Sequence, residues 1–142
     1  LRNSYLGGIS GSAIEAHYCD VTILASEFRE IQRTAIEFTG CKASIQQTQI
    51  FNVEGKAVSA QEASDVTISW TLIQQSNTAV EARDRSVVNI TGIELNNNGT
   101  GFKASKKGDV FGPATINVNQ LKEKNNKVLK EAEKKSVINI QQ

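Results

Sequence analysis

Several residue types are scarce in this chain of 142 residues, and each scarcity narrows what the chain can be. Methionine is absent, which favours a mature, processed or excised fragment of a longer polypeptide over a complete gene product. The one proline, Pro113, leaves almost every backbone N–H able to donate within a sheet. The one histidine, His17, excludes a metal cluster built on histidines.

Charge and hydrophobicity exclude further classes of protein. The formal net charge is only +1, so nothing indicates a nucleic-acid partner. No apolar run approaches the roughly 18 residues of a membrane span, and we expect no membrane insertion. With 39% hydrophobic residues, the chain can bury the core of one domain over residues 1–142. We expect that domain to hold no metal and no cofactor.

The chain does contain a repeat of 22 residues. Ala-Val-Ser-Ala at 57–60 returns as Ala-Val-Glu-Ala at 79–82 and as Gly-Phe-Lys-Ala at 101–104. A fixed period of this size is typical of a solenoid. Side chains two positions apart on a strand share a face, so two inward stacks are predicted. They are Ile14, Ile36, Val58, Val80 and Phe102, and Ala16, Phe38, Ala60, Ala82 and Ala104.

A second strand and a third apolar position follow the same period. The second strand carries a Ser, Thr or Asn between two apolar residues, and we expect that middle residue to face solvent. Its copies are 21–23, 43–45, 66–68, 88–90, 116–118 and 138–140. Five residues later comes the third apolar position, at Phe28, Ile50, Ile73 and Leu95. Leu1 and Leu6 have the same spacing, so we expect the chain to begin inside a coil that a missing N-terminal portion would precede.

Each coil thus has three short extended pieces joined by bends rich in Asn, Gly, Ser and Gln. Successive coils would lie about 4.8 Å apart and pair as parallel strands. The fold class predicted is all-β, a parallel β-helix of about six coils. Residues 105–113 lengthen the fifth coil. Residues 119–135 fit either a further coil or a short capping helix, and the spacing from Ile116 to Ile138, 22 again, favours the coil.

The pattern Val-x-Ile-x(4)-Leu-Asn-Asn-Asn-Gly-Thr-Gly-Phe-x-Ala at 88–104 resembles a known group. It is similar to the right-handed parallel β-helix repeats of pectate lyases, polysaccharide hydrolases and epimerases, and phage tailspikes. The segment 106–116 resembles a coil extension in repeat-containing bacterial surface proteins. The resemblance implies a right-handed helix, an extracellular or cell-surface bacterial location and contact with polysaccharide. The lyases' clustered calcium-binding Asp and catalytic Arg or Lys have no counterparts here.

Three functions are compatible with these features. The first is a non-catalytic module of a larger secreted or cell-surface protein, serving as a structural spacer or a glycan-binding surface. The second is the remnant of a polysaccharide lyase or hydrolase with an active site on an exposed sheet. The third is a segment of a phage tailspike, which would form a stable trimer. We expect the first, and the other two stay open.

The outward columns of the first strand supply the candidate site residues. Glu15 and Glu37 would be neighbours, close enough to share a cation, and glycosidic cleavage commonly uses two carboxylates. With His17 they are the catalytic candidates of the enzymatic alternative. Glu81 and Arg83, further along the same columns, are candidates for ligand binding.

The two cysteines, Cys19 and Cys41, are also 22 residues apart. They would occupy one position in adjacent coils, within the Cα separation of a disulfide. Stacked side chains point in parallel, however, and must twist to form the bond. We therefore favour free thiols over a disulfide.

Overall fold

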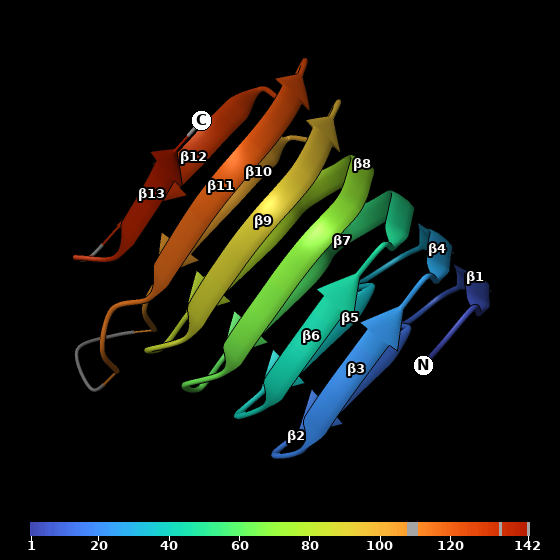
Figure 1. Cartoon of the computed structure of the whole chain (residues 1–142), viewed down its shortest axis with the longest axis horizontal. Helices are drawn as coiled ribbons and strands as arrows, with labels where there is room; N and C mark the ends of the chain where they lie inside the picture. Colours follow the sequence, from blue (N-terminus) through green and yellow to red (C-terminus); the bar gives the residue numbers. More distant parts are fainter. Residues whose placement is uncertain (108–110, 134, 142) are drawn as a thin grey trace.

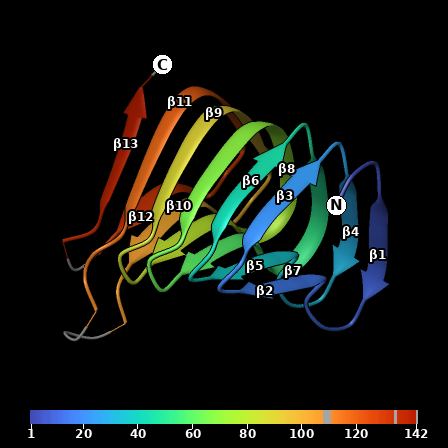
Figure 2. The same ribbon diagram turned by 60° about the horizontal axis from the view of Figure 1, so that its bottom comes forward.

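The computed structural model describes residues 1–107, 111–133 and 135–141, and these wind into a solenoid of about six turns (Figure 1). All of its strands pair in parallel in one continuous sheet, and the two termini lie at opposite ends of the stack (Figure 2). No helix occurs in this part of the chain, so none is present there that could cross a membrane. The strands are β1 (Tyr5–Ile9), β2 (Ile14–His17), β3 (Asp20–Leu24), β4 (Glu27–Ile31), β5 (Ile36–Thr39), β6 (Lys42–Gln46), β7 (Gln49–Gln61), β8 (Asp65–Arg83), β9 (Val87–Asn96), β10 (Thr100–Ser105), β11 (Thr115–Lys124), β12 (Val128–Ala132) and β13 (Val137–Gln141).

Each coil contributes to three faces, and the longest strands bend from one face to the next. Face A joins β1, β4, the start of β7, the middle of β8 and the ends of β9 and β11. Face B joins β2, β5, the ends of β7 and β8, β10 and β12. Face C joins β3, β6, the starts of β8, β9 and β11, and β13.

The predicted register is confirmed on all three faces. On face B, Ile36 pairs with Val58 and Val58 with Val80, and these side chains are fully buried. On face C, the six copies of the second strand lie in register, and all six middle residues are exposed or half-buried, as expected. On face A, Ile50 pairs with Ile73 and Ile73 with Leu95. The interior is therefore a narrow column of stacked aliphatic and phenylalanine side chains.

Strand β7 contains a bulge where the coil length changes by one residue. Its register shifts between Val53 and Lys56, where the partner strand β8 is one residue shorter. Gly55 lies in the bulge, and a Cβ there would overlap the carbonyl oxygen of Arg33 in the preceding coil. Glycine at this position lets the backbone of β7 approach that of the preceding coil closely.

The corners between faces use left-handed backbone conformations. At the corner from face C to face A, one residue of each coil has a φ near +50° to +77°: Asn3, Ala25, Gln47, Trp70, Gly92 and Gln120. The other two corners repeat the pattern, for example at Asn52 and at Tyr18. Most of these residues are not glycine, so their backbone conformation is strained. The strain allows the chain to turn while the hydrogen-bond ladders between coils continue.

Buried side chains at the corners also bind the backbone of the neighbouring coil. The hydroxyl of Ser64 accepts a hydrogen bond from the N–H of Cys41, and that of Ser86 accepts one from the N–H of Ser64, at 3.1 and 3.0 Å. The N–H of Ala114 likewise donates to the hydroxyl of Ser136, 22 residues later, at 3.0 Å. These bonds satisfy backbone groups that the turn of the chain removes from the strand ladders.

The described residues of the segment 119–135, which are 119–133 and 135, continue the solenoid as a coil, as favoured, and the alternative of a capping helix is wrong. β11 extends through Leu121 on face A, and β12 pairs with β10 on face B. In β12, Lys130 occupies the inward position that Phe102 holds in the preceding coil, and it is exposed. The hydrophobic column therefore thins at this end. Of the predicted insertion 105–113, residues 108–110 lie outside the described residues.

Candidate functional site

The predicted polar columns lie on the outer side of face B in the expected register. Glu15 pairs with Glu37, Glu37 with Ser59, and Ser59 with Glu81. The column continues to Lys103 and Glu131. The neighbouring column begins with His17 and Thr39 and continues through Gln61.

Glu81 and Arg83 are held by neighbouring coils. Glu81 is 4% exposed, and its carboxylate lies 2.9 Å from Nζ of Lys56 and 3.8 Å from Nε of Arg83. The Arg83 guanidinium donates to Oε1 of Gln61, with Nε at 3.1 Å. Gln61 in turn donates to the hydroxyl of Thr39 at 2.9 Å. These contacts cross three coils, so the two predicted ligand-binding residues are already engaged within the protein.

The predicted catalytic candidates are only partly brought together. Glu15 and Glu37 face each other across β2 and β5, as expected. Glu37 accepts a hydrogen bond from Gln61 at 3.3 Å. His17 is exposed, and its ring forms no hydrogen bond or ion pair with any residue that the structure describes. The histidine thus lies in the adjacent column without a contact that would couple it to the carboxylates.

Ser59 has a buried hydroxyl that no hydrogen bond within the described part of the chain satisfies. The residue is 1% exposed, and among the described residues its hydroxyl is the buried side-chain group without a hydrogen-bond partner. It lies between Glu37 and Glu81 in the column. The long side chains of face B therefore cover the strand so completely that the hydroxyl reaches neither water nor a partner.

The two cysteines are free thiols, as favoured. Cys19 is exposed, whereas Cys41 is 3% exposed and its sulfur lies 3.2 Å from the carbonyl oxygen of Ala16. Desolvation of the sulfur and its hydrogen bond with the Cys41 thiol raise the pKa of the Cys19 thiol. A thiol with a raised pKa is a poor nucleophile near neutral pH, so this pair has the properties of a packing contact.

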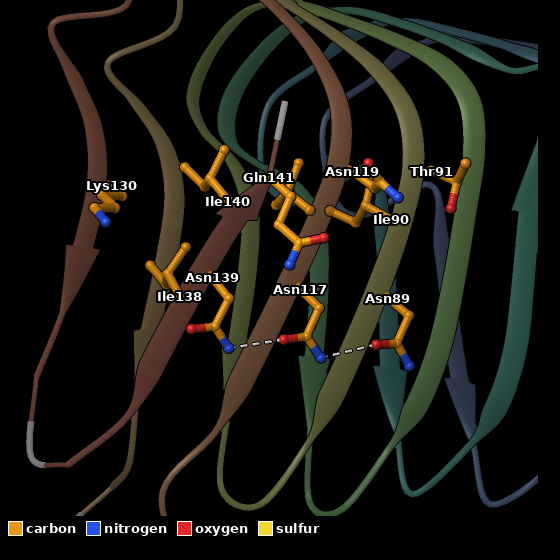
Figure 3. Close-up of a pocket in the computed structure, with 11 residues that line it drawn as sticks. Asn89, Ile90, Thr91, Asn117, Asn119, Lys130, Ile138, Asn139, Ile140 and Gln141 are labelled. Carbon is orange, nitrogen blue, oxygen red and sulfur yellow. Dashed lines mark hydrogen bonds between the residues drawn. The ribbon is translucent and has the colours of Figure 1, made fainter.

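A depression of about 660 Å³ lies at the C-terminal end of face C. Its most regular feature is a ladder of amides: Asn139 donates to Asn117, and Asn117 donates to Asn89, both at 2.9 Å (Figure 3). Ile138, Ile140 and Lys130, from the last coil, also line it. Because the amides bind one another, the ladder joins coils and leaves few groups for a ligand.

A second hollow, which sequence reasoning missed, lies at the corner from face C to face A. It encloses about 420 Å³ and is lined by Trp70, Leu72, Gly92, Glu94, Gln120 and Lys122, among others. Trp70 is the one tryptophan of the chain, and it is 61% exposed although its side chain is large and mostly apolar. The repeat itself carries the missed signal, because Gly92 follows Trp70 by 22 residues, and a small residue beside a large one leaves room for the ring.

Comparisons with protein-family models, with curated proteins and with solved structures found no match to this chain. The function proposed below therefore rests on the fold and on the surfaces described above.

Proposed function

We propose that this chain is a non-catalytic β-helix module of a larger secreted or cell-surface bacterial protein, in which the solenoid serves as a rigid spacer. The observation that carries the proposal is the use of the polar side chains on face B. Lys56, Glu81, Arg83 and Gln61 contact one another between coils rather than converging on an empty site.

A spacer built of equivalent coils tolerates a change in their number. Residues 58–79 span one period of 22, and their deletion would join Ala57 to Val80 with every inward stack still in phase. We expect the shortened chain to unfold cooperatively and to be shorter by about 4.8 Å, the spacing of one coil. Circular dichroism and the distance between labels at the two ends measure these properties.

Deletion of residues 58–68, half a period, is the matched control. It places strands of one face beneath strands of another, so the inward side chains no longer stack and cooperative unfolding is lost. If the full-period deletion also fails to fold, the coils are not interchangeable and the spacer proposal is wrong.

One observation favours the enzymatic alternative, a polysaccharide lyase or hydrolase that uses Glu15, Glu37 and His17. Glu15 and Glu37 are neighbours across β2 and β5. The test is turnover of a panel of neutral and acidic polysaccharides by the intact chain and by the Glu37→Gln variant. Turnover by the intact chain that the variant lacks would favour the enzyme over the spacer, whereas the spacer predicts no turnover by either.

A further inference from the structure

The hollow beside Trp70 has a wall fixed by the backbone of the next coil. Trp70 is the left-handed corner residue of its coil, and Gly92 is the corner residue of the next. A Cβ at Gly92 would overlap the six-membered ring of Trp70, so the ring lies directly against that backbone. An exposed aromatic ring held in this way presents a flat apolar surface without losing further conformational freedom on binding.

Several polar groups that line the hollow have hydrogen-bonding capacity left over. The indole N–H of Trp70, the amide of Gln120 and the ammonium of Lys122 form no hydrogen bond or ion pair with the residues that the structure describes. Glu94 uses one carboxylate oxygen to accept a hydrogen bond from Asn96 at 3.0 Å, and its other oxygen is available. A hollow of about 420 Å³ with an apolar wall and a few convergent polar groups has the size and character of a small-molecule site.

The charged groups that line the hollow favour a ligand without net charge. Glu94 and Lys122 occupy the same outward position in adjacent coils of face A, so their opposite charges largely cancel. An anionic ligand would meet the carboxylate of Glu94, and a purely apolar ligand would leave the amide, the ammonium and the indole N–H without partners. A neutral ligand with one apolar face and many hydroxyl groups fits both the ring and its surroundings.

We propose that this hollow binds one neutral pyranose ring of an oligosaccharide. The C–H face of the sugar stacks on Trp70, because those hydrogens carry partial positive charge and the ring face is electron-rich. Its hydroxyl groups donate to Glu94 and accept from Gln120, Lys122 and the indole N–H. This site adds a binding activity to the spacer role and uses none of the face B contacts that carry that role, so either can fail without the other.

The experiment uses the single tryptophan as its own reporter. The intact chain is titrated with neutral gluco-, manno- and xylo-oligosaccharides up to about 10 mM while indole fluorescence and calorimetric heat are recorded. At least one of them should give a saturable response in both measurements. The Trp70→Ala variant should lose about tenfold or more in affinity by calorimetry, with an unchanged circular dichroism spectrum.

Tyr18→Ala is the matched control, because Tyr18 is also an exposed aromatic residue that lies over a corner glycine, Gly40. It should change the affinity by less than about twofold. The absence of a saturable response to every neutral oligosaccharide, or equal affinity in the Trp70→Ala variant, would overturn the site. Tighter binding of an oligogalacturonate than of any neutral sugar would overturn the assignment of a neutral ligand.

Discussion

The side-chain carbonyl of Asn98 accepts hydrogen bonds from both the backbone N–H and the hydroxyl of Ser76 in the preceding coil, at 2.9 and 2.7 Å. Its amide nitrogen also donates to the carbonyl of Ile73 at 3.2 Å. Asn98 is 1% exposed, so none of these groups can turn to water instead. In this coil, the side chain of Asn98 therefore fixes the corner from face A to face B, and Asn126 makes similar contacts in the next coil.

Replacement of Asn98 by alanine should lower the free energy of unfolding by about 3 kcal/mol, because it leaves several buried polar groups without partners. Urea denaturation measures this loss. Asn77→Ala is the control, since Asn77 is exposed and its side chain forms no hydrogen bond with the described residues, and it should change stability by less than about 0.5 kcal/mol. Similar losses in the two variants would show that the buried contacts of Asn98 contribute little.

The repeat in the sequence was sufficient to predict the coils, because the inward side chains of a solenoid must match those of adjacent coils. Val58 and its stack could be found by counting, and so could the opposition of Glu15 and Glu37. The contact between Lys56 and Glu81 could not be predicted in this way. The two residues lie in adjacent coils but not at equivalent positions of the repeat, and the contact depends on the reach of their long side chains. The left-handed conformation of Trp70 was equally hidden, since such corners do not require glycine.

Gly92 should be much less tolerant of alanine than another left-handed glycine. Gly92 has a φ of +77° and Gly8 a φ of +65°, so both substitutions carry backbone strain of about 1 kcal/mol. A Cβ at Gly8 would meet nothing within 4 Å, whereas one at Gly92 would overlap the Trp70 ring. We expect Gly92→Ala to cost at least about 1 kcal/mol more than Gly8→Ala in urea denaturation and to shift Trp70 fluorescence. Equal costs would mean that the ring moves away freely.

The two thiols should differ in alkylation by iodoacetamide. Cys19 is exposed and should react in the folded protein, whereas buried Cys41 should react only on unfolding. Because the pKa of Cys19 is raised, its rate should continue to rise with pH beyond the range in which an ordinary thiol has ionised.

Removal of the neighbouring thiol provides the control for this pH dependence. In a Cys41→Ser variant, Cys19 loses its interaction with the second sulfur, and its rate profile should move to lower pH. Mass spectrometry at a series of pH values follows both proteins. A profile that stays in place would show that desolvation alone raises the pKa of Cys19.

Tyr18 should ionise above its ordinary pKa of 10.0 because its hydroxyl donates to Oε2 of Glu62, at 2.7 Å, and because the carboxylate repels the phenolate. A Tyr5→Phe background leaves Tyr18 as the one tyrosine whose absorbance reports ionisation. In that background Glu62→Gln should lower the pKa of Tyr18. Glu54→Gln, which alters an exposed carboxylate without a side-chain partner among the described residues, should leave that pKa in place.

The same contact between Tyr18 and Glu62 should make stability depend on pH in the alkaline range. Because the folded state holds the phenolic proton more tightly than the unfolded state, the contact stabilises the fold fully below about pH 10, and this stabilisation is lost as the pH rises through the raised pKa. The stability advantage of the unsubstituted protein over the Glu62→Gln variant should therefore shrink between neutral and strongly alkaline pH. Urea denaturation at a series of pH values measures this difference, and an advantage that grew over that range would contradict the hydrogen bond as its cause.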